Sequence, residues 1–369
     1  MTFYREEFPV TKDSVYFDVA HKASVPNCVI HSIMEFYKDV QQTGGDKERW
    51  SDTTLAVKEK IGRLINAVLE EIALVPNTVY GLNFLANGLK YFKGDNVIIS
   101  DQEHVSNIFP WTNLDRKGIE VRNVSSKEYF YTAADIEELI DDRTRVVSIS
   151  HVSTVPGSKV DLKPISDVCN EKNIFFFVDG VQSLGAMNVN VKEMGIDAMA
   201  TSGHKWLLSP YGMGFLYCSS DCVSKLESVF AGKLYTYDDQ TKINTSLIQD
   251  ARKWEIGSLN YSAVYGMNAA LDMILDIGIE KIENRILQLV NLLRQALKEL
   301  GLVITSPGNK NMSGIVAFEC VKIPSELYKY LVDNKIYVSL RKDQIRISIH
   351  FYNDENDIDK FIEIMKKFL

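Results

Sequence analysis

The sequence predicts an α/β protein in which a mostly parallel sheet, covered by helices on both faces, precedes a smaller α+β domain. Short, continuously apolar runs recur through the middle of the chain, at residues 96–100, 146–150, 174–178 and 214–217. Amphipathic stretches with helical spacing, such as 135–140 and 164–170, lie between them. Apolar strands that alternate with helices are typical of parallel sheets buried on both faces. From about residue 266 the pattern changes to longer helices and alternating strands.

The C-terminal part is expected to form the smaller α+β domain. Its expected elements are helices at 266–278, 279–300, 325–333 and 357–368 and strands at 314–318 and 344–350. Gly301 fits the end of the second helix. We therefore expect a large cofactor-binding α/β domain at 15–265 and a small domain at 266–369 that includes part of 1–14.

The composition narrows the class of protein further. Of 369 residues, 46% are apolar and 24% are charged, as in ordinary globular chains. The net charge of −8 disfavours binding to nucleic acid or to an anionic membrane, because such partners require a basic surface. Five scattered cysteines fit reduced thiols. Because there is neither an apolar run of about 18 residues nor a signal-peptide pattern, the expected location is the cytoplasm, without a membrane span.

Two segments carry the side chains that suggest chemistry. In residues 174–183 an apolar strand runs into Asp179 and a glycine turn. Ligands of α/β sheets bind at the carboxyl ends of strands, so this carboxylate is either a ligand group or a helix cap. In residues 201–206, Lys205 follows a hydroxyl and an imidazole in a turn of small residues. Burial disfavours the charged form of a lysine, and its neutral amine can form a Schiff base with an aldehyde.

Together, the Val-Asp-Gly-Val-Gln-Ser and Ser-Gly-His-Lys segments resemble the class V aminotransferase-like family of fold-type-I pyridoxal-phosphate enzymes. That family includes cysteine desulfurases, selenocysteine lyases, isopenicillin-N-epimerase-like proteins and several C–S lyases. The resemblance runs from Tyr16 to Asn353. It implies an α/β/α sandwich around a seven-stranded, mostly parallel sheet, a smaller C-terminal domain, and pyridoxal 5'-phosphate as the cofactor.

The resemblance also implies roles for several residues. Lys205 would hold the cofactor as a Schiff base and then move protons, while Asp179 would keep the pyridine nitrogen protonated. Gln182 would bind the phenolic oxygen of the ring, and His104 would stack on the ring face. The catalytic residues are thus expected to be Lys205, His104 and Asp179. Thr154, which stands where desulfurases usually have asparagine, is expected to contact the cofactor.

The cofactor phosphate requires hydrogen-bond donors at a helix start. A Pro-Asn turn followed by a helical pattern supplies them near Thr78 and Val79, where many relatives have a second threonine in place of the valine. The resemblance adds Ser202 and His204. It also implies that Gly257 and Ser258 reach across a homodimer to the phosphate of the partner subunit, so that the two active sites are shared.

The strand expected at 344–350 alternates between two faces. Isoleucines occupy one face, and Arg346, Ser348 and His350 share the other. Arg346 matches the family arginine that binds the α-carboxylate of an amino-acid substrate, where a bidentate pair fixes orientation as well as charge.

The sequence departs from cysteine desulfurases at one informative place. Those enzymes carry a nucleophilic cysteine on a loop before the arginine strand, but residues 334–344 are short and contain no cysteine. The nearest cysteine in the sequence, Cys320, is expected on or just after a strand. Val105 also replaces a histidine that is common in one desulfurase subgroup. A persulfide-forming desulfurase is therefore not expected.

We expect a pyridoxal-phosphate enzyme that acts on an amino acid through a Schiff base. A β-eliminating C–S lyase is the first hypothesis, and a class V aminotransferase or an amino-acid epimerase is the alternative. A non-catalytic cofactor-binding scaffold is the alternative of another class. Proton donors could decide the outcome, and the candidates are His21, Tyr211, Tyr235, Tyr237 and His350. Residues 231–253 are expected to cover the site. No metal site is expected, because Cys218 and Cys222 lack further ligands at zinc spacing.

Overall fold

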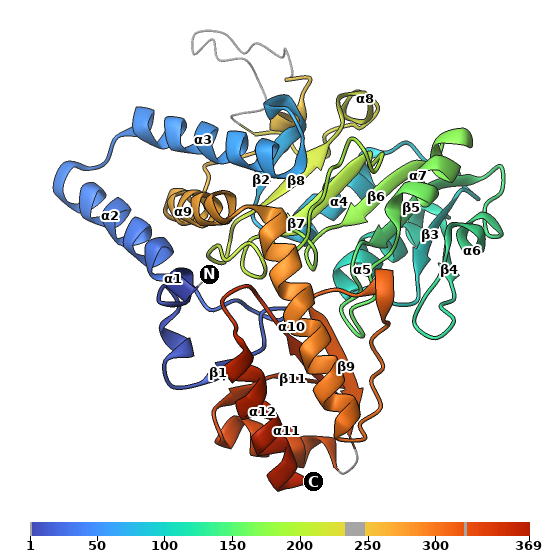
Figure 1. The fold of residues 1–369 in the computed structure, drawn as a ribbon. Coiled ribbons are helices and arrows are strands. Elements are labelled where there is room, and N and C mark those ends of the chain that lie inside the picture. The colour runs from blue at the N-terminus through green and yellow to red at the C-terminus, as the bar shows by residue number, and fades with distance from the viewer. Residues whose placement is uncertain (1, 233–247, 321–322) are drawn as a thin grey trace.

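The computed structural model describes residues 2–232, 248–320 and 323–369, and its centre is a seven-stranded sheet (Figure 1). The strand order is β2-β8-β7-β6-β5-β3-β4. The strands are β2 (Ile72–Val75), β3 (Asn96–Ser100), β4 (Glu120–Val124), β5 (Thr144–Ser150), β6 (Phe175–Asp179), β7 (Ala198–Ser202) and β8 (Gly214–Cys218). β4, β3, β5, β6 and β7 are mutually parallel, and β8 runs antiparallel to both β7 and β2. The predicted fold class is confirmed.

Side chains alternate between two hydrophobic cores, one on each face of the sheet. In β3, Val97 and Ile99 belong to one core, and Ile98 belongs to the other. In β5, Val146 faces the first core and Val147 faces the second. Because successive strand residues point to opposite faces, a continuously apolar strand is stable only where helices cover both sides.

Helices pack on both faces of the sheet. The first core is closed by α4 (Thr78–Gly88) and α5 (Val105–Thr112), which pack against each other. The second core receives α3 (Lys47–Ile65), α7 (Leu162–Glu171) and α9 (Tyr261–Ile277). α2 (Asn27–Thr43) lies along α9 and projects with α3 at one end of the molecule (Figure 1). Short helices α6 (Ala133–Glu137) and α8 (Ser220–Val223) complete this part.

The C-terminal part contains a three-stranded antiparallel sheet in the order β11-β12-β9. Its elements are α10 (Ile279–Glu299), β9 (Ile315–Glu319), α11 (Pro324–Asp333), β10 (Ile336–Tyr337), β11 (Ser339–Arg341), β12 (Gln344–Ser348) and α12 (Glu355–Phe368). β1 (Val15–Tyr16) pairs in parallel with β10. The chain just after the N-terminal segment therefore lies against the C-terminal part.

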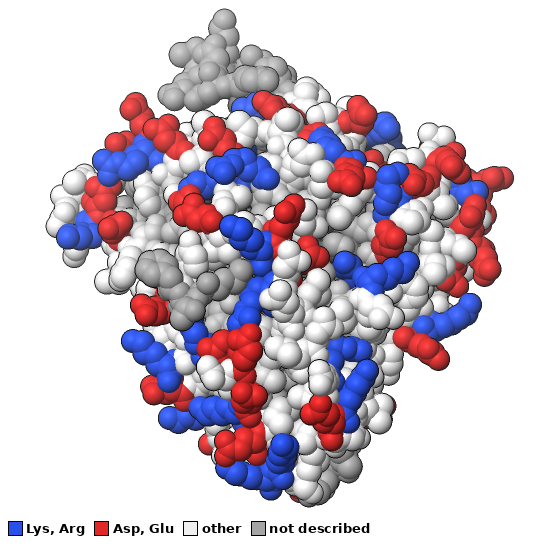
Figure 2. Space-filling model, viewed as in Figure 1, with Lys and Arg blue, Asp and Glu red and all other residues white. Residues whose placement is uncertain are grey.

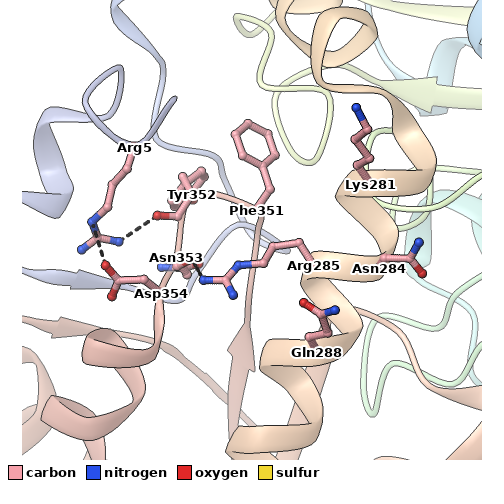
Figure 3. Close-up of a pocket in the computed structure, with 9 residues that line it drawn as sticks. All are labelled: Arg5, Lys281, Asn284, Arg285, Gln288, Phe351, Tyr352, Asn353 and Asp354. Carbon is pink, nitrogen blue, oxygen red and sulfur yellow. Dashed lines mark hydrogen bonds and ion pairs between the residues drawn. The ribbon is translucent and has the colours of Figure 1, made fainter. Parts of the chain in front are cut away.

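Ion pairs fix the N-terminal segment and α10 to the start of α12. Figure 3 shows the contacts just before that helix, where Arg5 lies beside Asp354 and the Tyr352 carbonyl, and Arg285 lies against Asn353. Arg5, at the end of α1 (Thr2–Arg5), forms a bidentate pair with Asp357 at 2.7 and 2.9 Å. Arg285 of α10 pairs with Glu355 at 2.6 and 2.9 Å. A cavity of about 490 Å³ lies between these elements, and α10 also contributes Lys281 to its wall.

The structure differs from the sequence-based expectations at several elements. The expected domain boundary at 265/266 falls inside α9, which packs along α2 and α3 and leads through Gly278 into α10. β4 was not expected, because its exposed polar residues mark a sheet edge rather than a buried strand. Most of the expected covering segment 231–253 lies outside the described residues, which resume at 248 with the short helix η5 (Ala251–Trp254).

The surface carries both signs of charge. In the face shown in Figure 2, Lys and Arg side chains are interspersed with Asp and Glu, and neither sign forms a continuous stripe. Within the described ranges, no helix has the length and apolar character needed to cross a bilayer.

Candidate active site

A cavity of about 810 Å³ opens where β6 and β7 end, between the starts of α4 and α5 and the strand β12. It brings together nine of the residues that the sequence predicted for the site. They are Thr78, Val79, His104, Thr154, Asp179, Ser202, His204, Lys205 and Arg346. These residues are separated by up to 268 positions in the chain, and parallel strand ends are the reason they meet at one edge of the sheet.

Asp179 ends β6 in the buried base of the cavity. Its Oδ1 accepts a hydrogen bond from the Val181 amide at 2.9 Å. Its Oδ2 is buried and has no hydrogen-bond partner among the described residues. Burial raises the pKa of Asp179 to about 7, and the nearby Glu103 carboxyl adds to the rise. The unpartnered oxygen is therefore suited to a ligand that brings its own hydrogen-bond donor.

Lys205 lies in the turn after β7 and faces the same cavity. Burial lowers the pKa of its ammonium to about 8, Asp179 opposes this shift, and Arg346 and Arg341 reinforce it. The turn is fixed by backbone hydrogen bonds from Leu208 to Lys205 and from Gly203 to Met213. A lysine held in this way presents a neutral amine far more often than an exposed one does.

Arg346 is fully buried on the cavity face of β12. Its guanidinium donates to the Thr154 carbonyl at 3.0 Å and to the Ser339 hydroxyl at 3.2 Å, and Asp18 lies 3.9 Å away. Its Nε has no partner among the described residues. Burial lowers the pKa of Arg346 to about 10. The guanidinium is thus held in place while retaining free donors for an anion.

The start of α4 forms a polar corner of the cavity. The Thr78 amide donates to Ser202 Oγ at 2.9 Å, and the two hydroxyl oxygens are 2.8 Å apart. One hydroxyl hydrogen is used between them, so the other remains free to be donated to an anion. The Tyr80 amide is bonded to the side chain of Asn77, which caps the helix. No hydrogen bond joins the Val79 amide to another described residue.

Two histidines line the cavity in different settings. His104 caps α5, and its Nδ1 accepts from the Ser106 amide at 3.2 Å. The proton of the neutral ring is therefore assigned to Nε2. Its pKa is lowered, first by burial and then by Lys205. His204 stacks on Tyr211 with ring centroids 4.3 Å apart, and burial lowers its pKa to about 4. Both rings are neutral aromatic surfaces at neutral pH.

Three predicted residues do not line the cavity of this chain. Gln182 is buried beneath it, where its amide donates to the Ala20 carbonyl at 3.0 Å and accepts from Trp206 at 2.8 Å. Gly257 and Ser258 are exposed on the segment that follows η5. Their expected role requires a second subunit.

The structure places some of the proton-donor candidates in the cavity and others away from it. His21 and Tyr211 line the cavity. His350 does not line the cavity. It is buried, and its ring nitrogen lies 3.0 Å from the carbonyl of Trp206, the residue that follows Lys205. Tyr235 and Tyr237 lie outside the described residues.

Sequence reasoning missed two charged residues near the site. Arg341 lines the cavity beside Arg346, and its position in the hairpin before the arginine strand was the available signal. Glu103 is buried behind His104, where it accepts from Ser100, Asn107 and Ser150. Only its neighbour was singled out, because nothing in the sequence distinguishes a buried glutamate in a turn from an exposed one. No cluster of metal-ligating side chains is found in the described part of the chain.

Comparison with known proteins gives matches over nearly the whole chain. The family model described as Aminotransferase class-V matches residues 15–361. A protein of Borreliella burgdorferi named probable cysteine desulfurase is 30% identical, with 99% of this chain and 95% of that protein covered. A protein of Methanothermobacter thermautotrophicus with the same name is 29% identical, with 98% and 96% covered.

Solved structures share the fold. An apo cysteine desulfurase from Thermococcus onnurineus NA1 superposes with a TM-score of 0.92 at 25% identity, covering 99% of this chain and 97% of that one. A cystine C–S lyase in complex with its product cysteine persulfide gives a TM-score of 0.91 at 23% identity, covering 96% and 98%.

Proposed function

The chain belongs to the aminotransferase class-V family, whose cofactor is pyridoxal 5'-phosphate, and on that premise we propose that it is a C–S lyase. In the proposed reaction, an amino acid with sulfur on its β-carbon and one water give pyruvate, ammonium and a thiol. The observation that carries this proposal is the composition of the cavity. Lys205, the unpartnered oxygen of Asp179 and Arg346 face it, and none of its described lining residues is a cysteine.

The cavity residues fit the cofactor at both of its ends. The buried Oδ2 of Asp179 has no partner and would accept a hydrogen bond from the protonated ring nitrogen. The start of α4, together with Thr78 and Ser202, would hold the phosphate through hydroxyl and amide donors. Lys205 would hold the aldehyde carbon. When bound, the cofactor withdraws electrons from the substrate α-carbon and so makes its proton acidic.

The residues of this chain then have separable tasks. Arg346 orients the substrate by binding its α-carboxylate with donors that have no other partner. Lys205 Nζ takes the proton from the α-carbon, and its lowered pKa allows this near neutral pH. The same amine returns a proton to the departing sulfur. His104 offers a neutral ring face to the cofactor.

The relatives named cysteine desulfurase raise the alternative that this chain makes alanine and a persulfide. That reaction needs a thiol in the cavity. Cys320 directly follows β9. Alternation along the strand puts its side chain on the face of the sheet that points away from Arg346, where it packs against the hydrophobic core. Burial raises the pKa of its thiol. These contacts argue against a nucleophilic role, because the thiolate is the reactive form.

We also propose that the active unit is a homodimer with shared sites. Gly257 and Ser258 are exposed a few residues after the buried end of η5, as expected for residues that contact a second subunit. A matching phosphate contact from the partner would complete the donors at the start of α4.

The proposal is tested by product analysis. Purified holoprotein is incubated with L-cysteine and with S-substituted L-cysteines, and pyruvate, released thiol, alanine and the chirality of the remaining substrate are measured. We expect equal amounts of pyruvate and thiol, and a loss of at least about 10³-fold in Lys205→Ala. Alanine from cysteine would identify a desulfurase. Inversion alone would identify an epimerase, amine transfer to a keto acid an aminotransferase, and silence in every assay a scaffold.

A further inference from the structure

Arg341 and Arg346 stand on one face of the β11–β12 hairpin. In its register Ser339 is opposite Arg346, and Arg341 is opposite Gln344. Because alternate residues share a face, Arg341 lies on the same side as Arg346 and is its diagonal neighbour across the strand pair. Such neighbours have Cβ atoms about 7–8 Å apart. Both side chains line the 810 Å³ cavity.

The two guanidinium groups differ in their hydrogen-bond and ion-pair partners. Arg346 is held by Thr154 and Ser339, with Asp18 at 3.9 Å. Arg341 is half-buried, and its hydrogen bond goes to the carbonyl of its own neighbour, Leu340, at 3.1 Å. No carboxylate of the described residues lies within ion-pair distance of it.

The described side chains that line the cavity supply no counterion for Arg341. Asp179 is the one carboxylate among the described lining residues, and it lies beside Lys205. The α-carboxylate of the substrate would neutralise Arg346. Arg341 already contributes to the lowered pKa of Arg346, as expected for two nearby cations without an anion between them. A second anion would stabilise both.

We infer that the substrate is an amino acid whose sulfur-linked side chain ends in a second carboxylate, and that Arg341 binds that carboxylate. This inference rests on the proposed C–S lyase function and narrows its substrate class. The spacing of the hairpin suits two carboxylates several ångströms apart, one held by each arginine. Short amino acids would occupy Arg346 alone.

The chemistry of the step is unchanged by this assignment. The bond between the β-carbon and sulfur breaks, and the sulfur keeps the bonding pair and takes one proton. The second carboxylate leaves with that thiol, while the rest of the amino acid takes up one water and becomes pyruvate and ammonium. Arg341 therefore contacts the leaving fragment, and it is a specificity-determining residue rather than a proton carrier.

The test compares two matched probes on holoprotein. S-(2-carboxyethyl)-L-cysteine carries the second carboxylate, and its carboxamide counterpart has nearly the same shape without the charge. Binding is read from the change in cofactor absorbance, which does not require elimination. We expect the wild-type protein to prefer the carboxylate about tenfold, equivalent to about 1.4 kcal/mol. Arg341→Gln should abolish the preference, and Arg341→Lys should restore part of it.

Lys342→Gln is the matched control, because it removes an exposed charge from the same turn without touching the cavity. It should keep the preference. The inference is overturned if the wild-type protein binds both probes equally or binds neither, or if Arg341→Gln weakens both to the same extent. A loss of bound cofactor in Arg341→Gln would instead assign this arginine to the phosphate. If the preference holds but no pyruvate forms, the proposed lyase reaction fails while the carboxylate site stands.

Discussion

Asp179 shows how a single residue links burial to function. A carboxylate with one unpartnered oxygen in a buried site is costly, because desolvation is not repaid by hydrogen bonds. The carboxyl of the neighbouring Glu103, which lies behind His104 and accepts from Ser150, also raises the pKa of Asp179. A cationic ring placed against Asp179 would relieve both effects. The apoprotein is thus expected to be destabilised at the point where the cofactor would bind.

This cost should appear in the stability of the apoprotein. The pKa of Asp179 is raised from 3.8 in a free side chain to about 7, so the folded state binds more protons than the unfolded state between these values. Stability therefore falls as the pH rises through that window. Asp179→Asn cannot ionise, and we expect it to stabilise the apoprotein on the order of 1–3 kcal/mol at pH 8 and less at pH 5.

Denaturant unfolding of the apoprotein at the two pH values measures this difference. The substitution keeps a side-chain oxygen that can accept from the Val181 amide, so this hydrogen bond is expected in both the wild-type protein and the variant. An equal effect at pH 5 and pH 8 would show that ionisation of Asp179 is not its cause.

At the scale of elements, the segment after η5 is anchored by a buried ion pair. Lys58 of α3 lies 2.9 Å from Glu255, and both side chains are almost fully buried. The same glutamate oxygen accepts the Leu74 amide of β2 at 2.8 Å. These contacts join a helix, a strand and the segment that leads to Gly257 and Ser258. They fix the starting point of the residues expected to reach a second subunit.

Breaking this pair should be costly. Lys58→Ala leaves Glu255 buried without its cation, and we expect a loss of about 3–5 kcal/mol in the free energy of unfolding. Lys367→Ala is the matched control, since its pair with Glu363 at 2.6 Å is exposed, and solvent screening should leave its loss nearly without effect on stability. Thermal unfolding of the two variants provides the comparison. Similar melting temperatures would contradict the assignment of the buried pair as an anchor.

At the scale of the whole molecule, apolar side chains are exposed around the active-site cavity. Val79, Val105 and Phe109 line a neighbouring groove of about 560 Å³ between α4 and α5, and all three are at least 40% exposed. Exposed apolar groups gathered at one place are typical of an interface. This groove shares Val79 with the main cavity, so a second subunit covering it would also reach the site.

The homodimer can be tested with two phenylalanines of similar exposure. Phe109→Glu introduces a charge into the groove and should weaken self-association at least about tenfold, measured by sedimentation equilibrium. Phe92→Glu is the control, because Phe92 is 68% exposed just before β3, at the edge of the sheet away from the cavity. A wild-type protein that stays monomeric, or equal effects of the two substitutions, would refute the expected interface.

The sequence by itself determined that buried strands alternate with helices, and which residue types follow two of those strands. The apolar runs at β3, β5, β6 and β8 are recognisable because strands buried on both faces need apolar side chains throughout. The motifs around Asp179 and Lys205 can be recognised from their residue types alone, without knowledge of the fold. The edge strand β4 has no such requirement, so its polar sequence lacks the apolar run that marks the buried strands.

Only the tertiary structure decided which charges remain without partners. Whether Asp179 Oδ2 is unpartnered, and whether Arg341 faces the cavity next to Arg346, depends on strand register and on packing between residues far apart in the chain. Local sequence sets backbone preference and apolar periodicity over a few residues. Burial and electrostatic environment are sums over the whole fold, and they are fixed only when that fold has formed.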